Sequence, residues 1–332
     1  MSLMLIIMMA IGFRSPVEFG VKGGGKSGFD SLNVEFIGNW PFGPSYAVTY
    51  DEARSVVFVG SGGGVYIIDV SNPSNPQKIS EIRTRGVVRG IFYEEISQRL
   101  YIAAGQGGLE IWDVSDLLSL SKLATYFTPG DAYAVYASGS YAYVADGDSG
   151  LRVIDVSNPI YPRIKAIYDT NARFGVHSIV LVDSFIYASA LIKGNPFINI
   201  YKVPSLELLR SLKEKSCARL VTDSNYLYLC WSGEHVDILD IRDRTNPIRC
   251  YEVSQDTYYF GEPYDVYADD AEIQDNYLFI TDGWFSIIDV SDKAHPMVIY
   301  CDCRPWGDVV HFALTKEYVF LLARESIEIY NI

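Results

Sequence analysis

The chain has 332 residues, of which 49% are hydrophobic and 20% are charged, a composition that excludes disordered and collagen-like polymers. Its formal net charge of -14 argues against nucleic-acid binding, which depends on lysine and arginine neutralising phosphates. Five cysteines without a CxxC pair fit neither a disulfide-dense small scaffold nor a zinc pattern, and 25 tyrosines with 16 phenylalanines favour strands over helices.

Residues 1–29 precede the first regular pattern. The apolar run 3–13 is too short to span a bilayer, and it lacks both the basic residue before and the cleavage site after it that an export signal carries. Residues 20–27, GVKGGGKS, match the phosphate-loop expression, but a strand pattern follows where a helix is required. We therefore interpret residues 1–29 as an apolar leader and a flexible Gly/Lys-rich tether, and expect no nucleotide there.

From residue 30 onward one unit recurs seven times. The lines GVYIIDVSNPSNP, GLEIWDVSDLLSL, GLRVIDVSNPIYP, HVDILDIRDRTNP and FSIIDVSDKAHP align on an aspartate, and FINIYKVPSL and SIEIYNI are degenerate copies. The aligned aspartates are Asp69, Asp113, Asp155, Asp240 and Asp289. Because Ser, Asn and Pro follow, we interpret each carboxylate as an acceptor for backbone N–H groups in a turn, a structural role.

Each of these lines follows another apolar run across a tight Gly/Asp turn, and one further strand pattern lies on either side of the pair. Four strands per repeat, apolar on both faces, predict an all-β, seven-bladed β-propeller of four-stranded antiparallel blades over residues 30–332. The last repeat supplies three strands, and residues 32–37, LNVEFI, have the pattern of a fourth. We expect this N-terminal strand to complete the last blade and close the ring.

The repeated line resembles the LVIVD repeat family, whose units read close to GLRVIDVSNP at residues 150–159. The resemblance covers about residues 32–332 and is weaker in the fourth and fifth repeats, where KVPSL and DIRDRTNP depart from the pattern. It implies a propeller, in many cases one at a bacterial or archaeal cell surface, and it does not imply an enzyme. Since the leader is ambiguous, a cell-surface or extracellular location and a cytoplasmic one stay equally open.

No resident metal or cofactor is expected. The stretch DGDSG at residues 146–150 lacks the remaining ligands of a calcium loop and is interpreted as a hairpin turn. The four histidines lie in different repeats without metal spacing, and no G-x-S-x-G motif occurs. The status of Cys301 and Cys303 stays open between a bridge to a neighbouring strand and two buried thiols.

Aligning the innermost strands brings three polar residues into consecutive blades: Arg219, Asp265 and His311. The other four blades carry small residues at this position, which are Ala47, Gly90, Ala134 and Ser178. We interpret the polar trio as an ion pair that stabilises one arc of the ring. The alternative is a catalytic site at the channel mouth, in which His311 is the acid or base, Asp265 orients it and Arg219 holds an anionic substrate.

Strand order places two sets of connections on one face of the ring: those from a fourth strand to the next first strand, and those from second to third strands. This face is expected to carry Trp40, Phe42, Phe174, Lys193, Tyr258, Tyr259, Phe260, Trp284 and Trp306. Aromatic side chains in irregular loops are typical binding anchors. The opposite face is expected to carry the Asp-Val-Ser-Asn-Pro turns and a solvated acidic insertion, Asp269, Asp270, Glu272 and Asp275.

These observations favour a non-catalytic binding propeller that recognises a protein or glycan partner through the aromatic loop face. The alternatives are an enzyme at the channel mouth and a structural surface-layer component. We expect no nucleic-acid partner and no membrane span, and the sequence leaves the oligomeric state open.

Overall fold

The computed structural model describes residues 35–41, 45–168, 175–192, 195–213, 219–230, 236–252, 270–281, 285–302, 309–315, 318–323 and 326–331. All of them belong to one compact unit, Leu32–Ile332. The expected leader and tether, residues 1–29, lie outside the described residues, as does Cys303.

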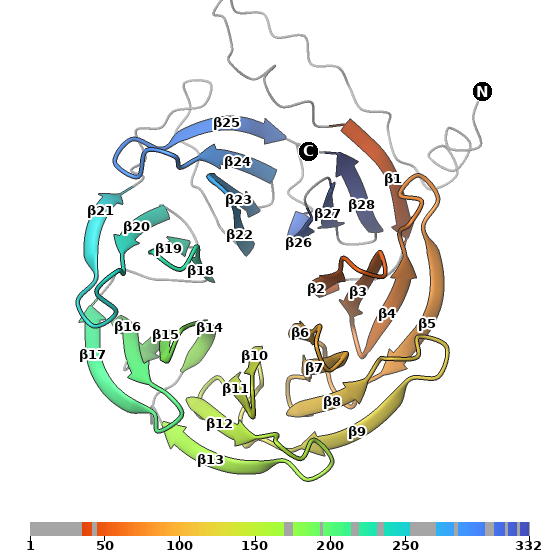
Figure 1. Ribbon diagram of the computed structural model, residues 1–332, viewed down its shortest axis with the longest axis horizontal. Helices are drawn as coiled ribbons and strands as arrows, with labels where there is room; N and C mark the ends of the chain where they lie inside the picture. The colour runs from red at the N-terminus through yellow and green to blue at the C-terminus, as the bar shows by residue number, and fades with distance from the viewer. Residues whose placement is uncertain are drawn as a thin grey trace, which may run out of the picture. The chain divides into compact units, whose positions relative to one another are not determined.

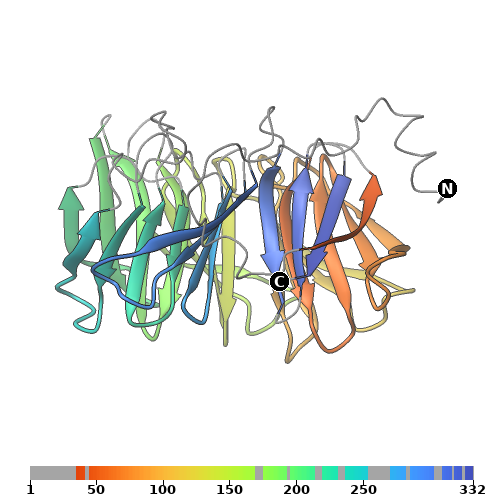
Figure 2. The same cartoon turned by 90° about the horizontal axis from the view of Figure 1, so that it is seen from above.

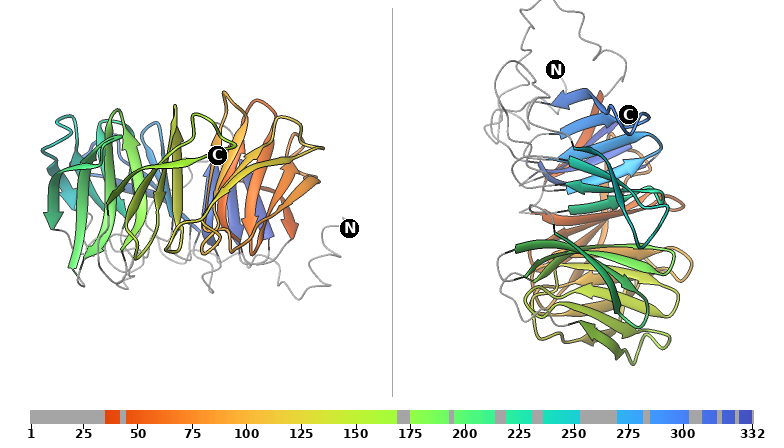
Figure 3. Two further views of the ribbon diagram at one scale, coloured as in Figure 1. Left: turned by 90° about the horizontal axis from the view of Figure 1, so that it is seen from below. Right: turned by 90° about the vertical axis from the view of Figure 1, so that its left-hand side faces the viewer.

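The described residues form 28 strands in seven four-stranded antiparallel sheets. The prediction of an all-β, seven-bladed propeller is confirmed, and Figure 1 shows the first strand of each blade nearest the centre and the fourth at the rim. Figures 2 and 3 show that the strands run between the two faces of the ring. In this part of the chain, no helix is long and apolar enough to cross a bilayer.

Each blade takes its strands in chain order from the centre outward, the last blade excepted. Blade 1 contains β2 (Ser45–Asp51), β3 (Val56–Ser61), β4 (Gly64–Asp69) and β5 (Gln77–Arg83), and blade 2 contains β6 (Gly90–Glu94), β7 (Arg99–Ala103), β8 (Leu109–Asp113) and β9 (Ser121–Tyr126). Blade 3 contains β10 (Ala134–Ser138), β11 (Tyr141–Ala145), β12 (Leu151–Asp155) and β13 (Arg163–Tyr168), and blade 4 contains β14 (Val176–Val182), β15 (Phe185–Ile192), β16 (Asn195–Lys202) and β17 (Glu207–Lys213). Blade 5 contains β18 (Arg219–Thr222), β19 (Tyr226–Cys230), β20 (Val236–Asp240) and β21 (Ile248–Glu252), and blade 6 contains β22 (Asp270–Gln274), β23 (Tyr277–Thr281), β24 (Phe285–Asp289) and β25 (Met297–Asp302). Blade 7 contains β26 (Val309–Leu314), β27 (Tyr318–Ala323), β28 (Ser326–Asn331) and, at its outer edge, β1 (Glu35–Pro41).

The outer strand of blade 7 comes from the N-terminal side of the chain. Strand β1 pairs antiparallel with β28, and a register irregularity lies between Phe36 and Gly38. The strand extends to Pro41, beyond the end of the expected range 32–37, of which residues 32–34 lie outside the described residues. Trp40, which we expected in a loop of the aromatic face, is instead a strand residue opposite Ile327.

The hydrophobic core lies between neighbouring blades, which explains why the strands are apolar on both faces. One cluster, for example, joins Phe58 and Ile67 of blade 1 to Leu100 and Ile102 of blade 2. The second strand of every blade adds one buried ring at the same register, and these rings are Phe58, Tyr101, Tyr143, Tyr187, Tyr228, Phe279 and Phe320. Each blade therefore contributes one large buried ring to the core at the same register.

The five repeated aspartates form the turns predicted for them. In each, one carboxylate oxygen accepts a hydrogen bond from the backbone N–H two residues later, at 2.8–3.0 Å. At Asp155 the Ser157 hydroxyl also donates, at 2.6 Å, and these two hydrogen bonds hold the pKa of the carboxyl below its usual value. The recurring aspartate is therefore explained by turn geometry.

Candidate functional site

The first strands of the seven blades present one residue each at an equivalent position near the ring axis. In every blade this residue pairs with a residue of the second strand. That partner comes two positions after the buried aromatic residue of the same strand. The residues at this position are Ala47, Gly90, Ala134, Ser178, Arg219, Asp270 and His311. Six of the seven residues that we aligned from the sequence are therefore at the expected position.

The residue of blade 6 differs from the prediction. The first strand of this blade begins at Asp270, five residues after Asp265, which lies outside the described residues. The segment YDVYAD resembles the first strands of other blades, but β22 forms from the sequence that follows it. The prediction of a solvated acidic insertion is therefore wrong for Asp270 and Glu272, which are strand residues near the axis, while Asp275 is exposed in the turn after β22.

Asp270 joins three consecutive blades. Its two carboxylate oxygens lie 2.8 Å from Nε of Arg219 in blade 5 and 3.1 Å from Nδ1 of His311 in blade 7. The backbone N–H of Phe312 donates to the carboxylate at 3.3 Å. Burial opposes ionisation of Asp270, but the Arg219 guanidinium and His311 outweigh it, so the pKa of this carboxyl lies below its ordinary value.

A neutral side chain makes the same contact elsewhere in the ring. At the equivalent position of blade 4, the Ser178 hydroxyl accepts a hydrogen bond from the backbone N–H of Leu220 in blade 5, at 3.0 Å. Leu220 and Phe312 each follow the axial residue of their own blade. The geometry therefore favours our interpretation of the polar trio as a connection between blades, with Asp270 in the place of Asp265.

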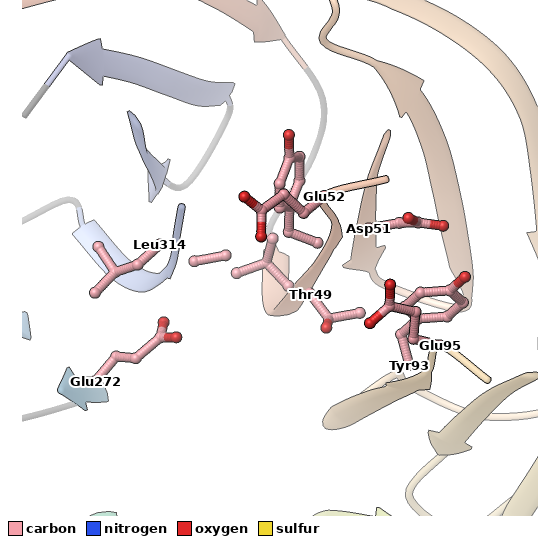
Figure 4. A pocket seen from close by; sticks show the side chains of 10 residues that line it. Thr49, Asp51, Glu52, Tyr93, Glu95, Glu272 and Leu314 are labelled. Carbon is pink, nitrogen blue, oxygen red and sulfur yellow. The ribbon is translucent and has the colours of Figure 1, made fainter. Parts of the chain in front are cut away.

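A pocket of about 320 Å³ lies toward the other end of the first strands. Figure 4 shows its acidic lining, with the Glu272 and Glu52 side chains facing each other across it. The residues that line it are Val48, Thr49, Tyr50, Asp51, Glu52, Tyr93, Glu95, Glu272, Ala313 and Leu314. Arg219, Asp270 and His311 are not among them, so the polar trio and the pocket are separate features of the axial wall.

Glu272 has the most perturbed carboxyl group of this pocket. It occupies a position that carries Thr49, Phe92 or Ala313 in other blades, and it lies opposite the buried ring of Phe279. Burial and the negative charge of Asp270 raise the pKa of Glu272 to about 8, while the Arg219 guanidinium opposes the rise. Glu272 is therefore mostly protonated at neutral pH.

The remaining acids of the pocket are arranged differently. Asp51 is buried and forms an ion pair with Arg54, whose guanidinium also donates to the carbonyl oxygen of Val114 at 2.7 Å and to the Tyr93 hydroxyl at 3.0 Å. These contacts connect blade 1 to blade 2 at the pocket rim. Within the described ranges no group of three or more His, Cys, Asp or Glu side chains is arranged to hold a metal ion.

Most residues of the predicted aromatic face lie outside the described residues, namely Phe42, Phe174, Lys193, Tyr258, Tyr259, Phe260, Trp284 and Trp306. The described residues on this face nevertheless contribute a row of three rings and one arginine around the axis. Directly before the axial residues of blades 1 to 4 stand Tyr46, Arg89, Tyr133 and His177. The Arg89 guanidinium lies 5.8 Å from the Tyr46 ring centre and 5.4 Å from that of Tyr133. The Tyr133 and His177 rings meet edge to face at 4.6 Å.

The backbone holds the four residues of this row in two ways. Tyr46 and His177 occupy register irregularities in β2 and β14, where an extra residue leaves the ladder. Arg89 and Tyr133 directly precede β6 and β10. Their backbone N–H groups donate to carbonyl oxygens of the second strands, Ala103 in β7 and Ala145 in β11, each at 2.8 Å. Burial lowers the pKa of His177, and the charge of Asp148 opposes this, so the ring is neutral at pH 7.

Sequence reasoning did not identify this row, although one signal was available. The alignment that found the axial position also fixes the residue before it, and three of the four residues there are aromatic or histidine.

These features define the chain as a seven-bladed β-propeller with a polar axial wall. The LVIVD repeat matches residues 57–84, 100–128, 129–170 and 266–300, so the chain carries LVIVD repeats, as the repeated line predicted. No curated protein matches the sequence.

Two solved structures illustrate the likeness of fold. The β-propeller domain of Cps50 (Swd1) from Myceliophteria thermophila has a TM-score of 0.73 at 13% identity, covering 90% of this chain and 99% of that one. The computationally designed Ika8 protein has a TM-score of 0.61 at 10% identity, covering 90% of this chain and 98% of that one. At these identities the likeness establishes the fold alone.

Proposed function

We propose that this protein is a non-catalytic binding propeller that recognises a protein or glycan partner at the face where the first strands begin. The observation that supports this function is the row Tyr46, Arg89, Tyr133 and His177, which extends across four consecutive blades. Tyrosine and arginine dominate the energetics of many interfaces, because they combine large contact area with directed donors. The sequence assigns Phe174, Tyr258, Tyr259 and Phe260 to the same face, and these remain predictions.

Exposed apolar side chains accompany this row on the connections between blades. Phe127, between β9 and β10, is 59% exposed, and Val87, between β5 and β6, is 40% exposed. Arg85 lies 5.3 Å from the Phe127 ring centre, so the neighbouring connection repeats the pairing of arginine with an aromatic ring. Apolar area beside fixed polar groups is typical of a recognition surface.

Catalysis at the axis receives less support from the geometry. Inter-blade bonding accounts for Asp270, and neither Arg219 nor His311 lines the acidic pocket. An enzyme and a structural surface-layer component stay as alternatives, and a cell-surface location stays a prediction of the family resemblance.

The test is a selection with matched surface variants. Wild type, a Val87→Ser/Phe127→Ser variant and a Leu118→Ser/Ile160→Ser variant would be immobilised and exposed to a random-peptide display library and a glycan array. Leu118 and Ile160 are 82% and 55% exposed and lie in turns between third and fourth strands, on the opposite face. We expect ligands that bind wild type and the second variant but not the first. Ligands that instead require Leu118 and Ile160, or an absence of ligands for wild type, would contradict the proposal.

A further inference from the structure

The guanidinium of Arg89 lies over tyrosine rings from both neighbouring blades. Its guanidinium carbon lies between Tyr46 of blade 1 and Tyr133 of blade 3, at 5.8 and 5.4 Å from the ring centres. The backbone N–H of Arg89 donates to the carbonyl oxygen of Ala103 at 2.8 Å, which fixes the start of the side chain. The rings hold the guanidinium through its positive charge and leave its N–H groups as donors for another molecule.

Two glycines allow this arrangement. A side chain at Gly90 would place its first carbon 2.8 Å from the carbonyl oxygen of Tyr133, so only glycine lets blade 3 approach so closely. Gly105 has a φ of +54°, and a first side-chain carbon there would lie 3.3 Å from the carbonyl oxygen of Val87, in the connection that leads to Arg89. The local sequence therefore supports the close contact between the arginine and the tyrosines.

The arginine has no acidic partner within the part of the chain that the structure describes. Six arginines of the described residues form an ion pair with an aspartate, and these are Arg54, Arg152, Arg219, Arg242, Arg244 and Arg249. Arg85 and Arg89, on one connection, instead lie over aromatic rings. The chain carries 41 acidic residues against 27 basic ones, so carboxylates are in excess. The Asp131 carboxylate approaches Gly105 from the next connection, as the Arg89 side chain does, but it forms no ion pair with Arg89. An exposed arginine that lies over rings and forms no ion pair with the chain's own carboxylates is suited to an acidic group of a ligand.

We infer that Arg89 binds a carboxylate of a peptide partner, with the guanidinium edge donating two parallel hydrogen bonds to its oxygens. This inference rests on the proposed binding function and specifies its ligand. A peptide is favoured over an acidic glycan because apolar side chains are exposed nearby, Val87 on the same connection as Arg89 and Phe127 on the connection of the next blade. A carboxylate flanked by apolar side chains satisfies both the arginine and these surfaces, and Arg85 over Phe127 adds a second cation nearby.

The test compares two pools of acetylated pentapeptide amides that differ in one central residue. One pool carries glutamate there and the other glutamine, with Leu, Phe, Val and Gly mixed at the flanking positions. Each pool is passed over immobilised protein, and the retained fraction is measured by mass spectrometry. We expect roughly tenfold or greater enrichment of the glutamate pool on wild type, the range for losing a charge-assisted bidentate contact.

Variants of Arg89 assign this preference to its guanidinium. Arg89→Gln is expected to abolish the enrichment, and Arg89→Lys to leave a small part of it, because an ammonium lacks the two-pronged geometry. Arg83→Gln removes the same charge from a side chain that is 91% exposed in the same stretch, and it should retain the enrichment. Unchanged melting temperatures show that the variants remain folded.

Three results would overturn the inference. They are equal retention of the two pools on wild type, a preference that persists in Arg89→Gln, and Arg89-dependent retention of glucuronate oligosaccharides without retention of the glutamate pool. If the surface selection yields ligands at Val87 and Phe127 that show no dependence on Arg89, the binding function stands and the carboxylate inference alone is wrong. If neither experiment yields a ligand, both proposals are wrong.

Discussion

Replacing Glu272 by Gln should remove a pH dependence from the stability of the fold. The folded protein holds the pKa of Glu272 at about 8, against 4.5 for the free side chain, because burial and the Asp270 charge disfavour the carboxylate. Between these two values the folded state retains a proton that the unfolded state has lost. Stability contributed by this group is therefore complete below about pH 4.5 and decreases as the pH rises to about 8.

The magnitude follows from the two pKa values. The interval from 4.5 to about 8 corresponds to about 5 kcal/mol at 25 °C if the folded-state environment acts in full. Glu272 is only partly buried and faces an open pocket, so solvent screens its charge, and we expect a loss of about 2 kcal/mol. Glutamine has nearly the same shape and does not titrate.

The assay is urea unfolding of wild type and Glu272→Gln at several pH values from 5 to 9. The variant should match wild type near pH 5, gain on it as the pH rises, and stay ahead by a constant amount above about pH 8.5. Glu95→Gln is the matched control, because Glu95 lines the same pocket but is exposed in the turn after β6. A stability difference between wild type and Glu272→Gln that is the same at every pH would refute the reasoning.

Three further changes test the remaining contacts. Asp270→Asn should lower the free energy of unfolding by about 2 kcal/mol at pH 7. Asp270→Ala should lower it by about 1 kcal/mol more, because the Phe312 N–H then also loses its acceptor. If urea unfolding gives the same free energy for the two variants, this reasoning is wrong. Asp155→Ala should lower the urea midpoint by loss of the turn hydrogen bonds, and no measurable change in that midpoint would argue against the role. Deleting residues 1–41 removes β1 and exposes the edge of β28. We therefore expect the free energy of unfolding to fall by several kcal/mol and the protein to associate with rising concentration in light scattering. A truncated protein as stable and monodisperse as wild type would contradict this.

The sequence predicted the fold because the repeat constrains it seven times. Each copy repeats the aspartate turn and the paired apolar runs, so errors in one copy are corrected by the others. The axial position was predicted in six blades for the same reason. It was wrong in blade 6, where YDVYAD has the composition of a first strand although Asp270 begins that strand. Local pattern could not decide between two adjacent candidate strands.

The candidate site was predicted less well, because a site depends on how side chains from different blades meet. Nothing in the separate segments around Tyr46, Arg89 and Tyr133 indicates that one guanidinium lies between two rings. The high pKa of Glu272 likewise depends on burial and on the charge of Asp270. Sequence pattern assigned both acids to a solvated loop, because clustered acidic residues are usually exposed.

The residues at the axial position of blades 4 and 6 make the same contact with different chemical groups. Ser178 connects its blade to the next with a neutral hydroxyl, and Asp270 makes the corresponding bond with a carboxylate, so the bond itself does not require a charge. The charge of Asp270 attracts Arg219 and His311 and also raises the pKa of Glu272, which couples the axial cluster to the acidic pocket. Asp270→Asn should therefore lower the pKa of Glu272 as well as weaken the contacts between blades. The Arg89 site lies among blades 1 to 3, where the axial residues Ala47, Gly90 and Ala134 carry no charge, so its ligand preference should not change when Asp270 is replaced.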